Sequence, residues 1–494
     1  MGILKPGCQH APGEIDHFGL WPDPLQHVTH GPHLVDPAVG DRDCLAKRSI
    51  YVSGEHLAVD EHEVGGHGVA RVAIRARATL PTMSSFWHPF GEMNKIQHSP
   101  FIVDRGEGIY VFDEKGDRYL DAAASLWYMN LGYGRDEIIE AMADQARKLP
   151  AFHAFIDYAT RPPIDLAGRI AAVSPDPESK VFFGSGGSDA VDTAAKLARR
   201  YFSAVGEPNR TVFISREWAY HGMHTYGTTL GGMEPNRTGY GGDLVSDVVL
   251  VPYDDAEAVE KAIDHVGAER VAGIFVEPVI GAGGIRPVPT EYLTRVREAM
   301  RASGGLYISD EVITGFGRCG DWFAANIYDL EPDIITFAKG VTCGYAPLGG
   351  IVASPRVAAP FFETPGLMFR HGYTYSGHTT ACVAGLVVMD IIEREGLLAR
   401  AAALEDELYQ ALLPLEELPV VSSIRRGVGA LAAVQLEVGD DETLPYRAAA
   451  ACREAGVLTR AVGGGGLQVS PPLIMTSEQV TEMASLFRAG LTGL

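Results

Sequence analysis

From about residue 84 onward, the sequence is a series of short apolar runs that alternate with longer segments of helical periodicity. The clearest runs are rich in β-branched or aromatic residues and end at turn residues or charges, which is typical of buried strands: 181–183, 211–214, 248–251, 271–276, 306–309, 333–337 and 348–353. Strands that are apolar throughout, with helices between them, predict a mostly parallel sheet covered by helices on both faces. The predicted fold class is therefore α/β.

The composition and the hydrophobic pattern of the sequence change at both ends of this series. Residues 1–82 are rich in His, Pro and Gly and lack a clear amphipathic period, so we expect a poorly ordered extension or one that is absent from the working protein. Residues 84–150 are expected to join a small domain, and 151–385 to form a large domain that carries the ligand site. After 385, helical patterns at 401–412 and 445–455 surround a strand at 430–436, which predicts a small C-terminal α+β domain over 386–494.

The alternative for residues 1–82 is a metal-binding arm. His62, Glu63 and His67 resemble the H-E-x-x-H zinc helix. However, the second His lies one residue too far along, and the Gly pair between them would break the helix that must present both rings. We therefore predict no metal site.

Net charge and cysteine content exclude some classes of function and indicate a compartment. The formal net charge is −22, from 41 basic and 63 acidic residues. An acidic surface repels phosphate backbones and anionic lipid, so we expect neither nucleic-acid nor membrane binding. Six scattered cysteines without a C-x-x-C pair favour a reducing compartment, and neither a membrane span nor a secretory leader is apparent. These features together predict a cytoplasmic protein.

Residues that follow the first predicted strand indicate an anion site. Ligands in α/β sheets bind at the carboxyl ends of the strands. A loop of Gly and Ser at 184–188 follows the strand and leads into a helical segment, whose free N–H groups and dipole favour a phosphate. Ser188 is expected to cap this helix. A plain turn is the alternative, because the loop lacks the Gly-Lys-Ser/Thr of a Walker A motif.

An aromatic ring, two carboxylates and a lysine follow other strands. Tyr220 could stack on a flat cofactor ring, or it could simply pack under its loop. Glu277 and Asp310 end apolar strands, where a carboxylate needs a partner such as a protonated heterocyclic nitrogen or an Arg. Lys339 lies in a small, Gly-rich stretch, and desolvation there would lower its pKa and make the amine nucleophilic. Together these groups fit one cofactor, pyridoxal 5′-phosphate (PLP).

Taken in order, these strings resemble the class III (ω-) aminotransferases of the fold-type I PLP-dependent enzymes, in particular the amine/β-alanine:pyruvate branch. The resemblance extends from Trp87 to Leu494. It rests on short matching sequence strings, which are residues 126–127, 132–135, 187–188, 220–222, 277–278, 310–312 with 315–318, 338–340, 371–378, and residue 460 before 470–472. It implies a PLP-binding large domain and a smaller α+β domain. It also implies a ping-pong transfer of an amino group from an amine, an ω-amino acid or an amino acid to a keto acid, with pyruvate as the expected acceptor.

The resemblance implies roles for the matching residues around the cofactor ring. Lys339 would form the Schiff base and move the substrate proton, and Asp310 would keep the ring nitrogen protonated. Tyr220 and Val312 would hold the ring between them. His221, in the same string as Tyr220, is also expected to bind the cofactor.

Other matching residues would bind the phosphate or the substrate. Gly187 and Ser188 would bind the phosphate, and Glu277 would hold the surroundings of Asp310 in place. Thr374 matches a phosphate ligand that the neighbouring subunit donates, which implies a homodimer with shared active sites.

Two matches concern the substrate itself. Trp127 matches an aromatic wall of the substrate pocket. Arg460 matches a mobile arginine that clamps a carboxylate and swings out for an amine without one, a task that suits a planar guanidinium. Gly464 departs from the branch, which often has Asp there, and could loosen the loop that carries Arg460. The natural amino donor is therefore left open.

Two rival functions follow from the same residues. A racemase, an aminomutase or a decarboxylase would use the same cofactor without a second substrate. A non-catalytic module with a PLP-type fold is the other rival, although the matching Lys339 and Asp310 favour an enzyme.

Overall fold

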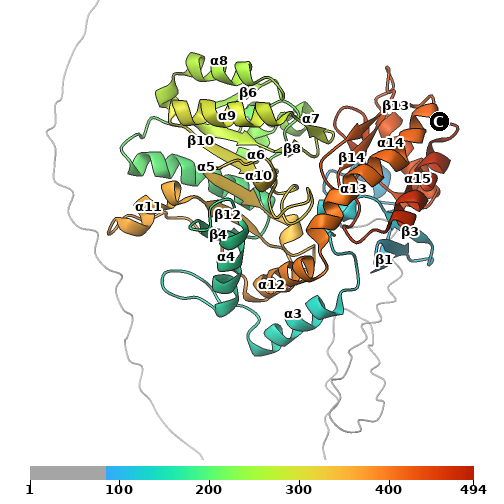
Figure 1. The fold of residues 1–494 in the computed structure, drawn as a ribbon, viewed down its shortest axis with the longest axis horizontal. Helices are drawn as coiled ribbons and strands as arrows, with labels where there is room; N and C mark the ends of the chain where they lie inside the picture. Colours follow the sequence, from blue (N-terminus) through green and yellow to red (C-terminus); the bar gives the residue numbers. More distant parts are fainter. Residues whose placement is uncertain (1–84, 99) are drawn as a thin grey trace, which may run out of the picture. The chain divides into compact units, whose positions relative to one another are not determined.

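The computed structural model describes residues 85–98 and 100–494. The predictions for residues 1–82, including the His-rich arm and the rejected zinc motif, lie outside the described residues. Within the described residues, every strand predicted between 181 and 353 belongs to one seven-stranded sheet (Figure 1). The strands, in spatial order, are β4 (Lys180–Gly184), β12 (Gly349–Ala353), β11 (Ile334–Phe337), β10 (Leu306–Asp310), β7 (Val271–Val276), β5 (Val212–Arg216) and β6 (Val248–Val251).

This sheet is mostly parallel, as predicted. Strands β11, β10, β7, β5 and β6 pair in parallel, and only β12 runs antiparallel to its two neighbours. Parallel strands need crossover connections, and the intervening helices supply them. The carboxyl ends of β5, β7, β10 and β11 therefore reach one edge of the sheet, where a ligand site is expected.

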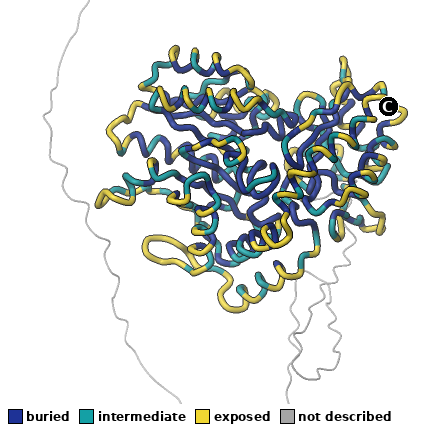
Figure 2. Tube along the Cα trace, viewed as in Figure 1, coloured by how far each residue is buried: buried dark blue, intermediate teal, exposed yellow. Residues whose placement is uncertain are grey.

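Helices cover both faces of the sheet because the strands are apolar on both sides. Apolar residues of α5 (Gly187–Ala204) pack on one face with Phe275 and Ile308. Those of α8 (Ala256–Val266) and α9 (Thr290–Ser303) belong to the core on the other face. Figure 2 shows the buried strands enclosed by partly exposed helices. Each fully buried Leu, Ile or Phe contributes about 1.5–3 kcal/mol, so this double-sided core holds the strand ends rigidly.

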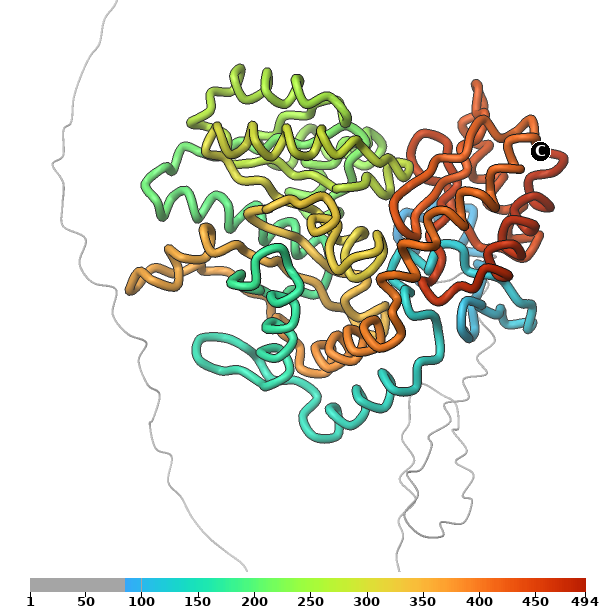
Figure 3. The backbone as a smooth tube through the Cα atoms, in the orientation of Figure 1, coloured from blue at the N-terminus to red at the C-terminus, as the bar shows by residue number. Residues whose placement is uncertain are grey.

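Two smaller sheets bring the first and last described segments together, as the tube in Figure 3 shows. Strand β15 (Val457–Leu458) of the C-terminal segment pairs in parallel with β3 (Arg118–Asp121), so the N-terminal strands join the C-terminal part. One sheet consists of β1 (Val103–Glu107), β2 (Tyr110–Asp113), β3 (Arg118–Asp121) and β15 (Val457–Leu458). The other consists of β13 (Val421–Arg426), β14 (Ala432–Leu436), β17 (Gly466–Val469) and β16 (Ala461–Val462).

The remaining helices pack around these sheets. The helical segments predicted at 401–412 and 445–455 are present as α13 and α14, and the last helix begins with a capping box between Thr476 and Gln479. The longer helices are α3 (Asp136–Lys148), α4 (Arg161–Val173), α11 (Pro355–Glu363), α12 (Thr379–Arg394), α13 (Leu397–Leu412), α14 (Leu444–Glu454) and α15 (Ser477–Leu491). Short elements are α1 (Met93–Ile96), α2 (Ala124–Trp127), α6 (Thr225–Leu230), α7 (Glu234–Arg237), α10 (Ala324–Ile327), β8 (Val279–Ile280) and β9 (Arg286–Pro287).

The helices give no sign of a membrane span. Across the part of the chain that the structure describes, none is both long enough and apolar enough to cross a bilayer.

Candidate active site

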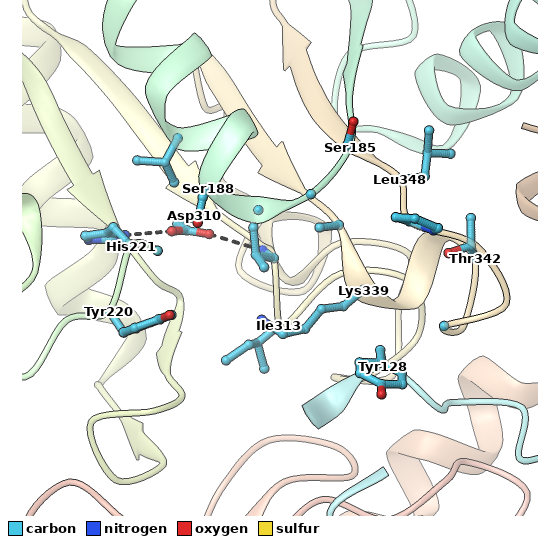
Figure 4. Close-up of a pocket in the computed structure, with 18 of the residues that line it drawn as sticks. Tyr128, Ser185, Ser188, Tyr220, His221, Asp310, Ile313, Lys339, Thr342 and Leu348 are labelled. Carbon is cyan, nitrogen blue, oxygen red and sulfur yellow. Dashed lines mark hydrogen bonds and ion pairs between the residues drawn. The ribbon is translucent and has the colours of Figure 1, made fainter. Parts of the chain in front are cut away.

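A cavity of about 450 Å³ lies at the carboxyl edge of the large sheet. Its walls come from the segments that follow β4, β5, β7, β10 and β11, which is where strand polarity places a ligand site (Figure 4). Most of the residues predicted from the sequence line it: Gly187, Ser188, Tyr220, His221, Glu277, Asp310, Val312 and Lys339. Trp127, Arg460 and Thr374 do not line this cavity.

Asp310 is the buried acid of the cavity, and it ends strand β10 with 4% of its surface exposed. The ring of His221 contacts one carboxylate oxygen, with 2.6 Å between Nδ1 and Oδ2 (Figure 4). The Thr336 hydroxyl and the Val312 N–H donate to Oδ1, at 2.9 and 3.2 Å. Burial acts to raise the pKa of Asp310, but His221, with help from Thr336, outweighs it and holds that pKa below its usual value. The carboxylate is therefore ionised at neutral pH.

Lys339 follows β11 and begins a short 3-10 helix (Lys339–Val341). Its backbone adopts a φ of +48°, a left-handed conformation that is unfavourable for a residue with a side chain and is typical of functional sites. Figure 4 shows the side chain extending into the cavity toward Ile313. Burial lowers the pKa of Lys339 to about 8, against the opposing negative charges of Asp310 and Glu277. About a tenth of the amine would be neutral at pH 7, far more than for an exposed lysine.

The predicted phosphate site is the start of α5, which begins at Gly187. Gly186 is the N-cap residue and supplies no side-chain cap, so the first N–H groups of the helix are available to an anion. Ser188 does not cap the helix, contrary to the sequence prediction. It lies inside the first turn, and its hydroxyl accepts a hydrogen bond from the N–H of Met223 (3.1 Å). That bond joins the anion site to the loop that carries Tyr220.

Two glycines of the cavity are required by close packing. A Cβ on Gly187 would lie 2.8 Å from a methyl of Val312. A Cβ on Gly222, which has a φ of +84°, would lie 2.5 Å from the Ser188 hydroxyl. These contacts bring Val312 and the loop after β5 against the start of α5, so the ring wall and the anion site are continuous.

Glu277 holds the loop that carries Tyr220. One carboxylate oxygen accepts from the Tyr220 N–H (3.0 Å) and the other from the Gly281 N–H (2.9 Å). The residue is 3% exposed, and burial raises its pKa. Glu277 therefore orients the aromatic side of the cavity through the backbone, and it has no direct hydrogen bond to Asp310 among the described contacts.

Trp127 and Arg460 lie together beside the cavity. The guanidinium carbon of Arg460 is 5.0 Å from the centre of the Trp127 ring, and the Lys339 amine is 5.8 Å from that same ring. Burial lowers the pKa of Arg460, and it forms no ion pair with a described residue. Thr374, by contrast, is exposed and does not line the cavity.

Several contributing residues were missed at the sequence level. Thr336, a polar residue in the otherwise apolar strand β11, supports Asp310, and that polar interruption was the available signal. Tyr128 lines the cavity beside Trp127. Glu311 faces away from it and accepts bonds from the N–H groups of Ala324 and Ala325 (2.5 and 2.9 Å), which hold the following loop in place. No sequence pattern pointed to that last contact.

Comparison with known proteins agrees with this geometry. The family model of the class-III aminotransferases matches residues 93–491. A probable aminotransferase of Mycobacterium tuberculosis is 39% identical over 441 residues, which cover 83% of this chain and 93% of that protein. The putrescine–pyruvate aminotransferase of Pseudomonas aeruginosa is 36% identical over 413 residues, with 78% and 89% covered.

Solved structures show the same relationship. An amine transaminase from an uncultivated Pseudomonas species, in its PLP-bound form, superposes with a TM-score of 0.79 at 37% identity and covers 83% of this chain and 98% of its own. A transaminase from the marine bacterium Virgibacillus gives a TM-score of 0.79 at 36% identity, with 82% and 96% covered. The chain belongs to the class-III aminotransferases. It is a PLP-dependent enzyme of fold type I that transfers an amino group to a keto acid.

The residues of the cavity fit PLP. An ionised, buried carboxylate suits a protonated ring nitrogen, and the open start of α5 suits a phosphate. Lys339 extends into the same space, where an amine of lowered pKa can react with an aldehyde. The His221 ring, held on Asp310 through Nδ1, lines the same cavity and so supports the carboxylate that would meet the ring nitrogen.

Proposed function

We propose that the natural reaction moves an amino group from an amine or an ω-amino acid to pyruvate. The observation that carries this proposal is the pairing of Arg460 with Trp127 beside the reactive lysine. A cation without an ionic partner suits a keto-acid carboxylate, whereas an aromatic wall suits the apolar part of an amine. The putrescine–pyruvate aminotransferase among the relatives supports the same pair of substrates.

The same geometry supports a role for each residue inside the cavity. PLP, when bound, supplies an aldehyde and an electron-withdrawing ring. Lys339 holds the reactive amine and carries a proton on Nζ to and from the substrate carbon, a role that its pKa of about 8 favours. Asp310 keeps the ring nitrogen protonated, and His221 fixes the orientation of that carboxylate. Tyr220 and Val312 position the ring, and Gly187 and Ser188 bind the phosphate.

The role of Arg460 is tested by comparing a substrate that has a carboxylate, pyruvate, with an amine donor that has none. For Arg460→Ala we expect the KM for pyruvate to rise about 10- to 100-fold, because charge-assisted hydrogen bonds to the carboxylate are lost. The kcat/KM for an amine donor without a carboxylate should change less than about threefold. Steady-state kinetics with each substrate varied in turn gives both values.

Arg453→Ala is the matched control, since Arg453 is an exposed arginine of the neighbouring helix α14. It should leave the KM for pyruvate unchanged. An Arg460→Ala enzyme with an unaltered KM for pyruvate would show that the carboxylate is bound elsewhere.

We also infer that the enzyme is a homodimer and that Thr374 serves the cofactor site of the partner subunit. Thr374 is exposed, and the loop against its segment presents apolar side chains to solvent, including Phe155 and the fully exposed Ile156. Such a patch is typical of a protein interface. Analytical ultracentrifugation should give about twice the 53.0 kDa mass of the chain. A fully active monomer would contradict the inference.

The remaining sequence predictions keep the status of proposals. A division of the chain into a large and a small domain is supported by the separate sheets that the flanking segments form. The boundary near 150 falls between α3 and α4, whereas the one near 385 falls inside the continuous helix α12. Folding studies of the isolated parts would test both boundaries. A cytoplasmic location is supported by the four described cysteines, which are buried and form no disulfide with one another: Cys319, Cys343, Cys382 and Cys452.

A further inference from the structure

The wall of the substrate pocket is built on a strained backbone. Ala124, Ser125 and Trp127 have φ values of +44°, +56° and +63°. Residues with side chains rarely adopt this left-handed region, and three of them within four positions persist only where surrounding contacts hold them. The sequence "Ala-Ala-Ala-Ser-Leu-Trp" at 122–127 contains no glycine that would relieve the strain.

One buried carboxylate accepts two backbone hydrogen bonds from this segment. Asp121 ends strand β3 and is 2% exposed. Its Oδ1 accepts from the N–H of Ala123 (3.1 Å), and its Oδ2 accepts from the N–H of Ser125 (2.7 Å) and from the hydroxyl of Tyr133 (2.8 Å). The carboxylate therefore holds the chain directly before and inside the left-handed turn.

The opposite side of the segment is tied to the C-terminal part. The N–H of Ser470 donates to the carbonyl of Ala122 (2.7 Å). The carbonyl of Ala123 accepts from the side chains of Gln468 (3.1 Å) and Ser470 (3.3 Å). These residues follow Arg460 in the hairpin of β16 and β17, so the wall and the arginine share one support.

The held segment presents two aromatic side chains at the site. The Trp127 ring is 5.0 Å from the Arg460 guanidinium carbon and 5.8 Å from the Lys339 amine. Tyr128 lines the cavity (Figure 4). The Ser125 and Tyr128 hydroxyls are 2.6 Å apart, so the backbone held by Asp121 also fixes Tyr128. Asp121 itself does not line the cavity.

We propose that Asp121 is a positioning residue, which holds the Trp127–Tyr128 wall in its strained conformation and thereby sets how sharply the enzyme discriminates amino donors by size. The proposal rests on the proposed role of Trp127 as a wall of the substrate pocket. Asp121 acts only through the backbone that it holds and takes no part in proton transfer.

The first test measures how firmly Asp121 holds the backbone of 122–128, and it does not depend on activity. In Asp121→Asn, one of the three donors must face an amide N–H₂, because the amide has a single oxygen. Hydrogen–deuterium exchange of the PLP-loaded enzyme should therefore become at least about tenfold faster in a peptide spanning 122–128, with little change elsewhere. Tyr133→Phe removes one donor only and should give a smaller increase in the same peptide, which also serves if Asp121→Asn does not fold.

Asp113→Asn is the matched control. Asp113 also accepts from two backbone N–H groups, those of Lys115 and Asp117 (both 2.9 Å), and from a tyrosine hydroxyl, that of Tyr119 (3.3 Å). It lies at the turn between β2 and β3 and does not line the cavity. Its replacement should leave exchange over 122–128 and donor kinetics unchanged.

The second test measures selectivity over a series of amines of increasing size, with pyruvate held constant. In Asp121→Asn the ratio of kcat/KM between the best and the worst donor should fall by about tenfold, while the visible absorbance of bound PLP is retained. Unchanged exchange over 122–128, or an equal loss of rate for every donor, would overturn the proposal. The exchange result stands even if the proposed substrates are wrong, so the two failures are distinguishable.

Discussion

Replacing Lys339 by alanine is expected to lower kcat by at least about 10³-fold with every donor, because the substrate proton then has no carrier. The cavity is otherwise intact, since Lys339 forms no ion pair with a described residue and lies in a short helical turn. Rapid-mixing kinetics of the PLP-loaded variant should locate the loss in the proton-transfer step. Addition of a small primary amine should restore part of that rate.

Lys261→Ala provides the control for this experiment. Lys261 lies on the outer helix α8, with 72% of its side chain exposed and Glu257 as its partner. Its loss should leave kcat within about twofold of the native value, as is usual for surface substitutions. A Lys339→Ala enzyme that keeps more than a tenth of native activity would mean that another group moves the proton.

Replacing Asp310 by asparagine is expected to lower kcat/KM by about 10²- to 10³-fold, a loss comparable with removing one preorganised electrostatic contact. Asparagine keeps the shape of the side chain and can still accept from Thr336, but it lacks the charge that holds a ring nitrogen in its protonated form. The His221 ring then faces an amide in place of the carboxylate. Steady-state kinetics gives the loss, and the visible spectrum reports the changed protonation of the bound cofactor.

Asp333→Asn is the control for Asp310. Asp333 precedes the neighbouring strand β11 at the opposite edge of the sheet, and its side chain accepts from the N–H of Tyr307 (2.9 Å) and pairs with Arg356 (3.0 Å). Its replacement should cost stability but leave the spectrum and kcat/KM near the native values. An Asp310→Asn enzyme within about threefold of native kcat/KM would contradict the role given to that carboxylate.

The fold could be predicted from local pattern because the large sheet is buried on both faces. Continuous apolar runs such as 271–276 therefore predict strands that lie between helices. All of these runs are strands of the one sheet. The antiparallel direction of β12 could not be predicted, since its apolar run 348–353 resembles those of its parallel neighbours.

The part of the candidate site that could be predicted consists of reactive side chains placed at the ends of strands. Asp310 and Lys339 end or follow strands, so their convergence at one edge follows from sheet polarity. Contacts made by backbone groups were not predictable. The capping role assigned to Ser188 was wrong because Gly186 takes the cap position, and the hold of Asp121 on Ala123 and Ser125 depends on left-handed backbone that no residue type signals here.

The central claim is that this chain transfers an amino group in two half-reactions through one cofactor. The direct measurement is to mix the PLP-loaded enzyme with a panel of amines and ω-amino acids in the absence of any keto acid, and to follow the visible absorbance. We expect the absorbance of bound PLP to fall with release of about one carbonyl product per site, and to return when pyruvate is added, with formation of alanine. Continuous turnover without a keto acid, or an absorbance that no donor changes, would contradict the account.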